Sequence, residues 1–565
     1  MSKPTRYSDL MVKEFFKKKE WLPLTLFQVW EKNAKRYPER EAVVDGKNRY
    51  TWQEASVAIN RFAFALVEAG FKKDDVLVLQ LPNTAELPLL RVACEKAGVI
   101  CLPILRNLRT REVAEIMGRL KVRGIVLPGK YRGVDYFEMA NQIKPELPSL
   151  QYIMVLDDNV PDGAISVMHI LQDPLEKHHT PEVLSEKITQ EKIFDQQNEF
   201  FKSTCYPPHE VSMINHTSGT TGFPKFVEYS MAARLALGRG FVNTFKLTEN
   251  DVICALGSVP AGVNNVAYFA APQAASKVVM LNHFAAETAF KIIEKEKVTV
   301  TCGVPAMYTL MVRSPVRNEY DLSSVRLWWC GSAFLPFSLG VEVEEKLGAK
   351  IVNGMGAVDF GGTTIADPDN PLEKRVLTVG KPQSGTIIKI VHDNGSEVEK
   401  GEIGEIWGTG PACSSGYYQD PETTRQTWTD DGWFRSGDLG RLDEDGNVII
   451  VGRKKDVIIR GGQNIYPTEV ETLLLTHPSV ADVAVVAIPD PVMGEKACAC
   501  AVLKPGMPLT FKEMESFLNN KDIAFYKIPE RLEIIETMPT VGGGTKIDKK
   551  VLRKDIIDKL KKIKS

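Results

Sequence analysis

The segment from His216 to Ser230 reads HTSGTTGFPKFVEYS and lies between two runs that are typical of β-strands. Its glycines allow the backbone to turn several amides toward one point, and Lys225 adds a mobile positive charge. The hydroxyl and amide donors of this loop belong to Thr217, Ser218, Gly219, Thr220, Thr221 and Gly222. Such a concentration of donors predicts a loop that binds a polyphosphate.

The loop differs from a Walker loop, which would run from GK[ST] directly into a helix. Here Pro224 and the β-prone letters FVEYS surround the lysine. The alternative interpretation is an exposed turn, because Gly, Ser and Thr are the ordinary residues of turns.

Three further segments carry groups suited to a nucleotide. Asp438 follows a glycine in WFRSGDLG, where its two oxygens could accept hydrogen bonds from both ribose hydroxyls. Lys546 stands in the glycine-rich PTVGGGTKIDKK, ahead of a basic helical tail. Small residues in CGSAFLP, from Cys330 to Pro336, could lie flat against a base. Taken singly, each could instead be an ordinary turn or a solvated charge.

Together and in this order, the segments resemble the motifs of the adenylate-forming superfamily. This superfamily includes acyl- and aryl-CoA ligases, adenylation domains of peptide synthetases and firefly luciferases. The resemblance runs in register from the region of Thr51 almost to the C-terminus. Besides the loop, the nucleotide contacts that it implies are Gly331, Ser332, Ala333, Asn353, Gly354, Met355, Gly356, Asp438 and Arg453.

The sequence departs from the superfamily pattern at several of these motifs. In NGMGAVDFGG, Met355 replaces an aromatic residue, Val358 a threonine and Asp359 a glutamate. Val358 cannot donate a hydrogen bond to a phosphate, whereas Asp359 remains a hard oxygen ligand. The resemblance therefore assigns magnesium to Asp359 with Thr217. Phe226 and Thr545 stand where the superfamily has glycines.

The resemblance also implies that the chain works in two half-reactions, with a C-terminal domain that rotates between them. Lys455 occupies the hinge position, and Gly461 and Gly462 would line the path of the CoA thiol. Lys546 occupies the position of the catalytic lysine. No protein nucleophile is needed, because the adenylate is itself an activated anhydride.

A cation is needed in the first half-reaction because a carboxylate must approach the α-phosphate of ATP. At about 4 Å and an effective dielectric near 20, this repulsion costs on the order of 4 kcal/mol, or roughly three powers of ten in rate. An ammonium group between the two anions would cancel most of it, and we assign this role to Lys546. Lys225 and magnesium on Asp359 would stabilise the departing pyrophosphate.

The acid is expected to bind between LGSVPAGVNNVAYFAAP and the segment from 354 to 361. Most relatives carry a histidine in the first of these, and this chain does not. The pocket residues that the resemblance implies are Ala261, Gly262, Asn264, Gly331, Gly354, Gly356 and Phe360. They predict a compact apolar cavity for a ring or a short to medium chain. For Asn264, capping of a helix is an equally good interpretation.

The function predicted is an AMP-forming acid–CoA ligase that uses ATP, Mg²⁺ and CoA and acts on a small carboxylic acid. The spacing of the motifs is most similar to benzoate, cyclohexanecarboxylate and dihydroxybenzoate ligases. Two alternatives remain open: an enzyme that loads an aryl acid onto a carrier protein, and a nucleotide-binding protein without turnover.

The sequence patterns around these residues predict helices and strands that alternate, as in an α/β fold. Apolar strand-like runs alternate with helical segments, which indicates mostly parallel sheets flanked by helices. TWQEASVAINRFAFALVEAGF predicts a helix that begins after Thr51 and stops at Gly70, followed by a βαβ unit. We expect a large domain over residues 1–454, with a β-barrel-like part, and a small mobile α+β domain over 455–565.

Composition excludes other classes of partner. The 70 basic and 72 acidic side chains give a net charge of −2, which offers no field for nucleic acid or an anionic membrane. The nine cysteines form no CxxC pair, and no signal peptide or membrane span is expected. We therefore expect a cytoplasmic protein. A homodimer is compatible with the sequence, which does not determine the oligomeric state.

Overall fold

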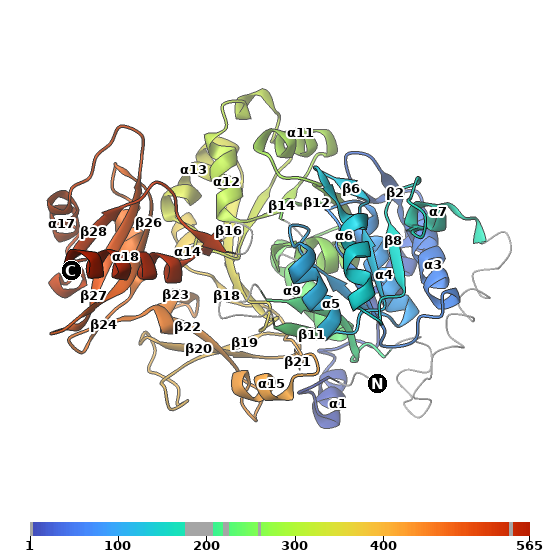
Figure 1. Cartoon of the computed structure of the whole chain (residues 1–565), viewed down its shortest axis with the longest axis horizontal. Coiled ribbons are helices and arrows are strands. Elements are labelled where there is room, and N and C mark those ends of the chain that lie inside the picture. Colours follow the sequence, from blue (N-terminus) through green and yellow to red (C-terminus); the bar gives the residue numbers. More distant parts are fainter. Residues whose placement is uncertain (1–3, 176–206, 218–224, 258–261, 542–545, 565) are drawn as a thin grey trace.

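The computed structural model describes residues 4–175, 207–217, 225–257, 262–541 and 546–564. They form a large N-terminal part, built on two mainly parallel sheets, and a smaller C-terminal part at the opposite end of the molecule from α3 and α4 (Figure 1). A four-stranded antiparallel sheet comes between the two parts in the chain. The α/β class that the sequence predicts is confirmed.

The first sheet has nine strands in the order β18-β17-β16-β15-β14-β12-β13-β1-β2. The strands from β16 to β1 pair in parallel, whereas β17, β18 and β2 join the edges antiparallel. The strands are β1 (Glu41–Val44), β2 (Arg49–Thr51), β12 (Val252–Ala255), β13 (Lys277–Met280), β14 (Val300–Gly303), β15 (Leu327–Cys330), β16 (Lys350–Gly356), β17 (Thr363–Ile365) and β18 (Lys381–Pro382).

The second sheet has eight strands in the order β21-β11-β10-β4-β3-β5-β8-β9. It is parallel from β10 to β9, and β11 and β21 form an antiparallel edge. The strands are β3 (Val76–Leu79), β4 (Ile100–Pro103), β5 (Gly124–Leu127), β8 (Tyr152–Val155), β9 (Ile165–Ser166), β10 (Val211–His216), β11 (Phe226–Ser230) and β21 (Gly416–Tyr417).

The two sheets share one layer of helices, and each has a further layer on its outer face. Leu77 and Leu79 of β3 join the core that both sheets share, whereas Val76 and Val78 pack on the outer side, as the alternation of a strand requires. Burial of both faces explains why the strand runs are apolar throughout. The inner helices are α2 (Leu26–Arg36), α3 (Trp52–Glu68), α4 (Glu86–Ala97), α9 (Met231–Phe245) and α10 (Ala271–Ala274). The outer helices are α5 (Thr110–Arg119), α6 (Tyr136–Ile143), α11 (Ala286–Glu296), α12 (Pro305–Arg313) and α13 (Phe337–Leu347).

The local signals read from the sequence determine the ends of two inner helices. Thr51 and Glu54 form the expected capping box of α3, in which each side chain accepts a hydrogen bond from the backbone N–H of the other residue. Gly98 ends α4 with φ of 69°, in the left-handed region that favours glycine. Since β3 and β4 pair in parallel around α4, the predicted βαβ unit is confirmed.

The expected barrel-like part is a four-stranded antiparallel sheet in the order β19-β20-β22-β23. Residues 454–457 connect it to the C-terminal sheet, so Lys455 lies in the connection between two sheets. The strands before this connection are β19 (Ile387–Val391), β20 (Gly404–Thr409), β22 (Phe434–Leu442) and β23 (Val448–Arg453).

The C-terminal part has a five-stranded sheet with helices on both faces. α16 and α17 cover one apolar face, and α18 covers the other. A short hairpin, β29–β30, joins Thr540 and Val541 to Lys546 and Ile547. The elements are β24 (Ile458–Arg460), β25 (Gln463–Ile465), α16 (Pro467–Leu474), β26 (Val480–Asp490), β27 (Gly494–Leu503), α17 (Phe511–Asn519), β28 (Arg531–Ile534) and α18 (Lys549–Lys564).

The N-terminal segment Thr5–Trp21, here called the N-terminal strap, crosses the chain at residues 411–417. Tyr7 Oη donates to Cys413 O at 2.9 Å, and Arg6 Nε donates to Ser414 O at 2.9 Å. The indole N–H of Trp21 donates to Pro411 O at 2.7 Å. These bonds satisfy carbonyl groups that would otherwise be buried without partners, so the strap holds this segment in place.

In the described part of the chain, no helix is both long and apolar enough to cross a membrane. All eight cysteines described are buried and free of disulfides. They behave as small apolar core residues, as the sequence suggested.

The strap also creates a pH-sensitive contact. Glu228 of β11 is buried and accepts a hydrogen bond from Thr5 N, and burial raises the pKa of Glu228 to about 7. Its pKa in the folded chain therefore exceeds its unfolded value. The stabilisation is present at low pH and is lost as the pH rises through 7.

We predict that Glu228→Gln removes this loss, because glutamine keeps the acceptor and cannot ionise. Relative to the native protein, the variant should gain up to about 2 kcal/mol of stability, and a correspondingly higher melting temperature, as the pH rises from 5.5 to 8.5. Differential scanning calorimetry at both pH values measures it, with the exposed Glu68→Gln as control. A difference between variant and native protein that stays constant with pH would contradict the assignment.

Candidate functional site

A cavity of about 1860 Å³ opens between the N-terminal and C-terminal parts. Both parts line it, and it collects most of the residues to which the sequence assigned a role. Of those residues, the ones that line it are Thr217, Lys225, Gly262, Gly331, Ser332, Ala333, Asn353, Gly354, Met355, Gly356, Asp359, Asp438, Arg453 and Lys455. Ser218, Gly219, Thr220, Thr221, Gly222, Ala261, Thr545 and the side chain of Lys546 lie outside the described residues.

The predicted phosphate loop is closed at its base by a β-hairpin. β10 and β11 pair antiparallel, with His216 opposite Phe226. Beyond them, Thr217 N donates to Lys225 O at 3.0 Å, and Lys225 N donates to Thr217 Oγ1 at 3.2 Å. The two described ends of the loop are therefore fixed against each other, and both reach the cavity.

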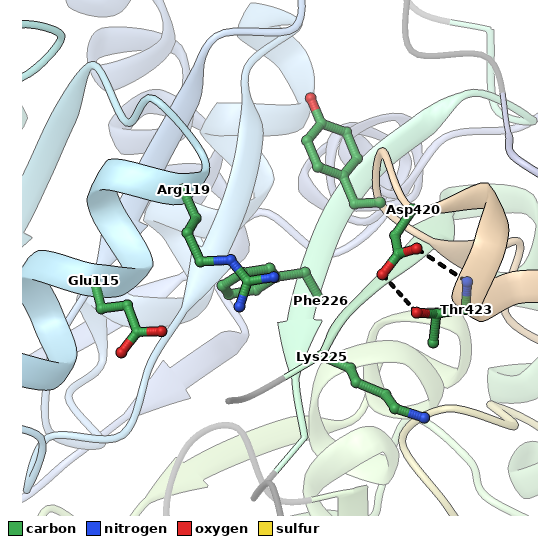
Figure 2. Close-up of a pocket in the computed structure, with 7 residues that line it drawn as sticks. Glu115, Arg119, Lys225, Phe226, Asp420 and Thr423 are labelled. Atoms are coloured by element: carbon green, nitrogen blue, oxygen red, sulfur yellow. Dashed lines mark hydrogen bonds between the residues drawn. The ribbon is translucent and has the colours of Figure 1, made fainter. Parts of the chain in front are cut away.

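Phe226, which stands where the superfamily has glycine, is part of the core. Its side chain is buried, and the guanidinium of Arg119 lies 5.1 Å from its ring centroid. Figure 2 shows the two side by side in a small pocket behind the hairpin, with Lys225 extending away from Arg119. The larger residue thus fills space between α5 and β11, outside the main cavity.

Asp359 lies in a segment that is held in place through its own backbone: four successive carbonyl groups, those of residues 358–361, each accept a hydrogen bond. Tyr229 Oη donates to Val358 O, and Ser414 Oγ donates to Asp359 O at 2.6 Å. Ser414 N donates to Phe360 O at 2.9 Å, and Arg234 Nη2 donates to Gly361 O at 3.1 Å. We call this set of bonds the carbonyl clamp. It fixes the position from which the Asp359 side chain enters the cavity.

The carboxylate of Asp359 is suited to magnesium. Tyr417 Oη donates to Asp359 Oδ2 at 2.9 Å, which leaves Oδ1 available to other partners. No set of three or more His, Cys, Asp or Glu side chains that could hold a metal occurs among the described residues. Magnesium is commonly held by one or two carboxylates together with substrate phosphates, so a single aspartate in a phosphate-binding cavity fits it.

An aromatic wall that the sequence analysis missed forms the inner end of the cavity. Trp329 is the next-to-last residue of β15, and its indole N–H donates to Val263 O at 3.2 Å. Phe241 of α9 packs against it with a centroid distance of 5.6 Å. A Cβ on Gly354 would lie 2.5 Å from the Trp329 ring, so only glycine permits this approach. The signal was the tryptophan pair WW directly before CGSAF.

The turn after β15 lines the cavity and contains one residue with a strained backbone conformation. Ser332 has φ of 70°, a left-handed conformation that residues other than glycine rarely adopt.

Asn353 of β16 supports the backbone at the cavity wall. Its Nδ2 donates to Val376 O at 3.3 Å, and its Oδ1 accepts from Gly354 N at 2.9 Å. Met355 packs partly on the core of the four-stranded sheet. The amide of Asn353 therefore positions backbone at the cavity wall.

The two residues expected at the ribose are neighbours across strands. Asp438 of β22 and Arg453 of β23 lie opposite each other, and Arg453 Nε is 3.0 Å from Asp438 Oδ1. The arginine side chain is 47% exposed and the aspartate 16%. An ion pair this open to solvent contributes little to stability, so a ribose could take over its hydrogen bonds at low cost.

Four residues with a role predicted from the sequence lie outside the cavity lining. Asn264 is fully buried and donates to Gly257 O at 2.8 Å, which favours a structural role in holding the loop after β12 and not the expected helix cap. Phe360 stacks on Phe434 at 5.4 Å in the core below the carbonyl clamp. Gly461 and Gly462 form the β24–β25 turn, with φ of 55° and 83°.

The C-terminal part lines the cavity with residues near Lys546, and not with the Gly461–Gly462 turn. Thr540, Ile547 and Asp548, which flank the loop of Lys546, line it, as does the start of α18. The hairpin β29–β30 thus faces the N-terminal part in this conformation, and the Gly461–Gly462 turn does not.

Comparison with known proteins supports one family for the whole chain. Residues 30–418 match the model of the AMP-binding enzyme family, and residues 469–544 match that of the AMP-binding enzyme C-terminal domain. The chain is 30% identical to the medium-chain fatty-acid–CoA ligase of Escherichia coli (strain K12), over 96% of this chain and 92% of that one. It is 29% identical to the 2,3-dihydroxybenzoate-AMP ligase of Bacillus subtilis (strain 168), over 98% of both.

The fold is also that of a solved structure, ATP-bound MatB from Rhodopseudomonas palustris. The TM-score is 0.81 at 23% identity, over 95% of this chain and 99% of that one. The α/β architecture with its small C-terminal domain is shared along the whole length. The chain therefore belongs to the AMP-binding enzyme family, and it is an enzyme of the AMP-forming acyl-CoA ligase type.

Proposed function

We propose that the protein joins a small carboxylic acid to CoA through an acyl-adenylate, with release of pyrophosphate and then AMP. One observation carries this proposal: a single cavity is lined by the base of the phosphate loop, Asp359, the Asp438–Arg453 pair and the hairpin that contains Lys546. These groups suit the triphosphate, the metal, the ribose and the reacting carboxylate, respectively.

In the first half-reaction, a carboxylate oxygen attacks the α-phosphorus of ATP, and the bond to the bridging oxygen of pyrophosphate breaks. The loop amides and Lys225 bind the negative charge that collects on pyrophosphate. Magnesium held by Asp359, with Thr217 as a further ligand, would supply positive charge at the phosphates. Lys546 lowers the repulsion between the two reacting anions.

The second half-reaction needs a route for the thiol of CoA to the adenylate carbonyl. Lys454 is anchored to the four-stranded sheet by Asp393 at 2.8 Å and Glu405 at 3.1 Å. Rotation would therefore begin after Lys454, at Lys455. It would withdraw the Lys546 hairpin and bring Gly461 and Gly462 to the cavity, where backbone without side chains can border a narrow thiol path.

The acid itself is proposed to be cyclic or of medium chain length. Trp329, Phe241 and Leu237 give the inner cavity an apolar, partly aromatic wall. Arg234 also reaches the cavity, where its Nη2 donates to Gly361 O and Ala412 O. The relatives named above act on a medium-chain fatty acid and on 2,3-dihydroxybenzoate, which agrees with such a wall.

The proposal is tested by exchange of labelled pyrophosphate into ATP with a panel of acids. The panel contains benzoate, cyclohexanecarboxylate, dihydroxybenzoate, C6 to C12 fatty acids and malonate as the dicarboxylate. We expect exchange with cyclic or medium-chain acids and acyl-CoA formation with the same acids. Exchange without thioester formation from CoA would indicate loading of a carrier protein. Absence of exchange with every acid would indicate a nucleotide-binding protein.

We predict that Lys546→Ala lowers the rate of adenylation by about 10³-fold, because roughly 4 kcal/mol of anion repulsion is no longer cancelled. Conversion of a supplied acyl-adenylate and CoA to acyl-CoA should change little. Single-turnover assays of each half-reaction measure both effects. The exposed Lys554→Ala, on the same basic tail, is the matched control. Equal loss in both half-reactions would remove the role given to Lys546.

We predict that Asp359→Asn raises the Mg²⁺ concentration needed for half-maximal pyrophosphate exchange by at least 10-fold, because a neutral amide binds a hard cation weakly. Binding of AMP, measured by calorimetry, should stay within about 2-fold, since AMP lacks the β- and γ-phosphates. The exposed Asp162→Asn serves as control. An unchanged Mg²⁺ requirement would show that the metal is held elsewhere.

A further inference from the structure

Tyr417 connects two residues that are proposed to act on the same phosphates. Its hydroxyl donates to Asp359 Oδ2 at 2.9 Å. On its face, the ammonium of Lys225 lies 4.9 Å from the ring centroid. One side chain therefore contacts an anion through its edge and a cation through its π-system, which is the arrangement that the ring quadrupole favours.

The ring of Tyr417 has no freedom to follow either partner. Tyr417 is 1% exposed and packs in the core that the two large sheets share. Its backbone belongs to β21, paired with Val227, and its N–H donates to Thr424 Oγ1 at 3.0 Å. Thr5 Oγ1 of the N-terminal strap donates to its carbonyl at 3.3 Å. The phenol ring is thus held in one position, and that position determines where the Asp359 carboxylate and the Lys225 ammonium can contact it.

The backbone under Asp359 is fixed as well, by the carbonyl clamp. With its backbone held, the carboxylate can still rotate about its side-chain bonds. The hydrogen bond to Oδ2 restricts this rotation and leaves Oδ1 as the oxygen offered to the cavity. Side chains that orient a metal ligand in this way commonly affect metal affinity by 10–100-fold without contacting the metal.

We propose that Tyr417 is a positioning residue, which aims the Asp359 carboxylate at the magnesium of MgATP and holds Lys225 beside it. The inference rests on the proposed function, since it assumes that Asp359 receives magnesium. It assigns a specific task to a residue outside the cavity lining, and it explains how the shorter aspartate is held at a definite position.

The test is Tyr417→Phe, which keeps the ring and its face for Lys225 and removes only the hydroxyl. Isothermal calorimetry gives the affinity for ATP as a function of Mg²⁺ concentration. We expect the Mg²⁺ concentration that gives half of the maximal affinity to rise about 10-fold. Affinity for ATP in EDTA and for AMP should stay within about 2-fold. Tyr418→Phe, the neighbouring buried tyrosine whose ring packs in a different core, is the matched control.

A double-mutant cycle with Asp359→Asn separates positioning from general loss of packing. If the hydroxyl acts through the carboxylate, Tyr417→Phe should change the Mg²⁺ dependence by less than about 2-fold in the Asp359→Asn background. Equal effects of Tyr417→Phe in both backgrounds would overturn the proposal, as would an unchanged Mg²⁺ dependence in the single variant. A loss of AMP affinity that matches the loss of MgATP affinity would also overturn it.

The native protein distinguishes failure of this inference from failure of the proposed function. If the native protein binds MgATP no better than ATP in EDTA, the roles given to Asp359 and Tyr417 are both wrong, whereas the ligase function is decided separately by the exchange assay. If it prefers MgATP and Tyr417→Phe keeps that preference, only the role of Tyr417 is wrong.

Discussion

The repulsion between a carboxylate and a triphosphate is the constraint on which the site depends. Both anions must enter the site from water, and the positive groups proposed to meet them come from two separate parts of the chain, on either side of a large open cavity. In the proposed mechanism, distribution of the charge over two parts of the chain also allows one group to leave once its half-reaction is complete.

In the N-terminal part, the residues proposed to bind the phosphates and the metal lie next to the ends of strands from both large sheets. β16 ends at the cavity in one sheet, and β11 begins there in the other. The carbonyl clamp joins the segment after β16 to the second sheet. Asp359 and the two described ends of the predicted phosphate loop, Thr217 and Lys225, are therefore held in fixed positions relative to each other. Loops that carry function are usually mobile, and here hydrogen bonds to successive carbonyl groups replace the missing regular pairing.

The N-terminal strap adds an outer layer to this frame. It binds the carbonyls of residues 411–417, and that segment in turn binds the segment of Asp359. The strap precedes the region that matches the AMP-binding family model, which begins at residue 30. Residues far apart in sequence thus set the position of one carboxylate. A buried Glu228 beside the strap makes this layer sensitive to pH near neutrality.

Much of the fold could be predicted from the sequence because its signals are local. The capping box of Thr51 and Glu54, the stop at Gly98 and the apolar strand runs each depend on neighbouring residues, and the structure bears them out. The order of the motifs likewise indicated the family. What the sequence could not give was the burial of Asn264 and Phe360, the wall formed by Trp329, or the contacts of Tyr417. Those depend on which strands become neighbours and how their side chains pack, and such long-range contacts leave no periodic trace in one chain.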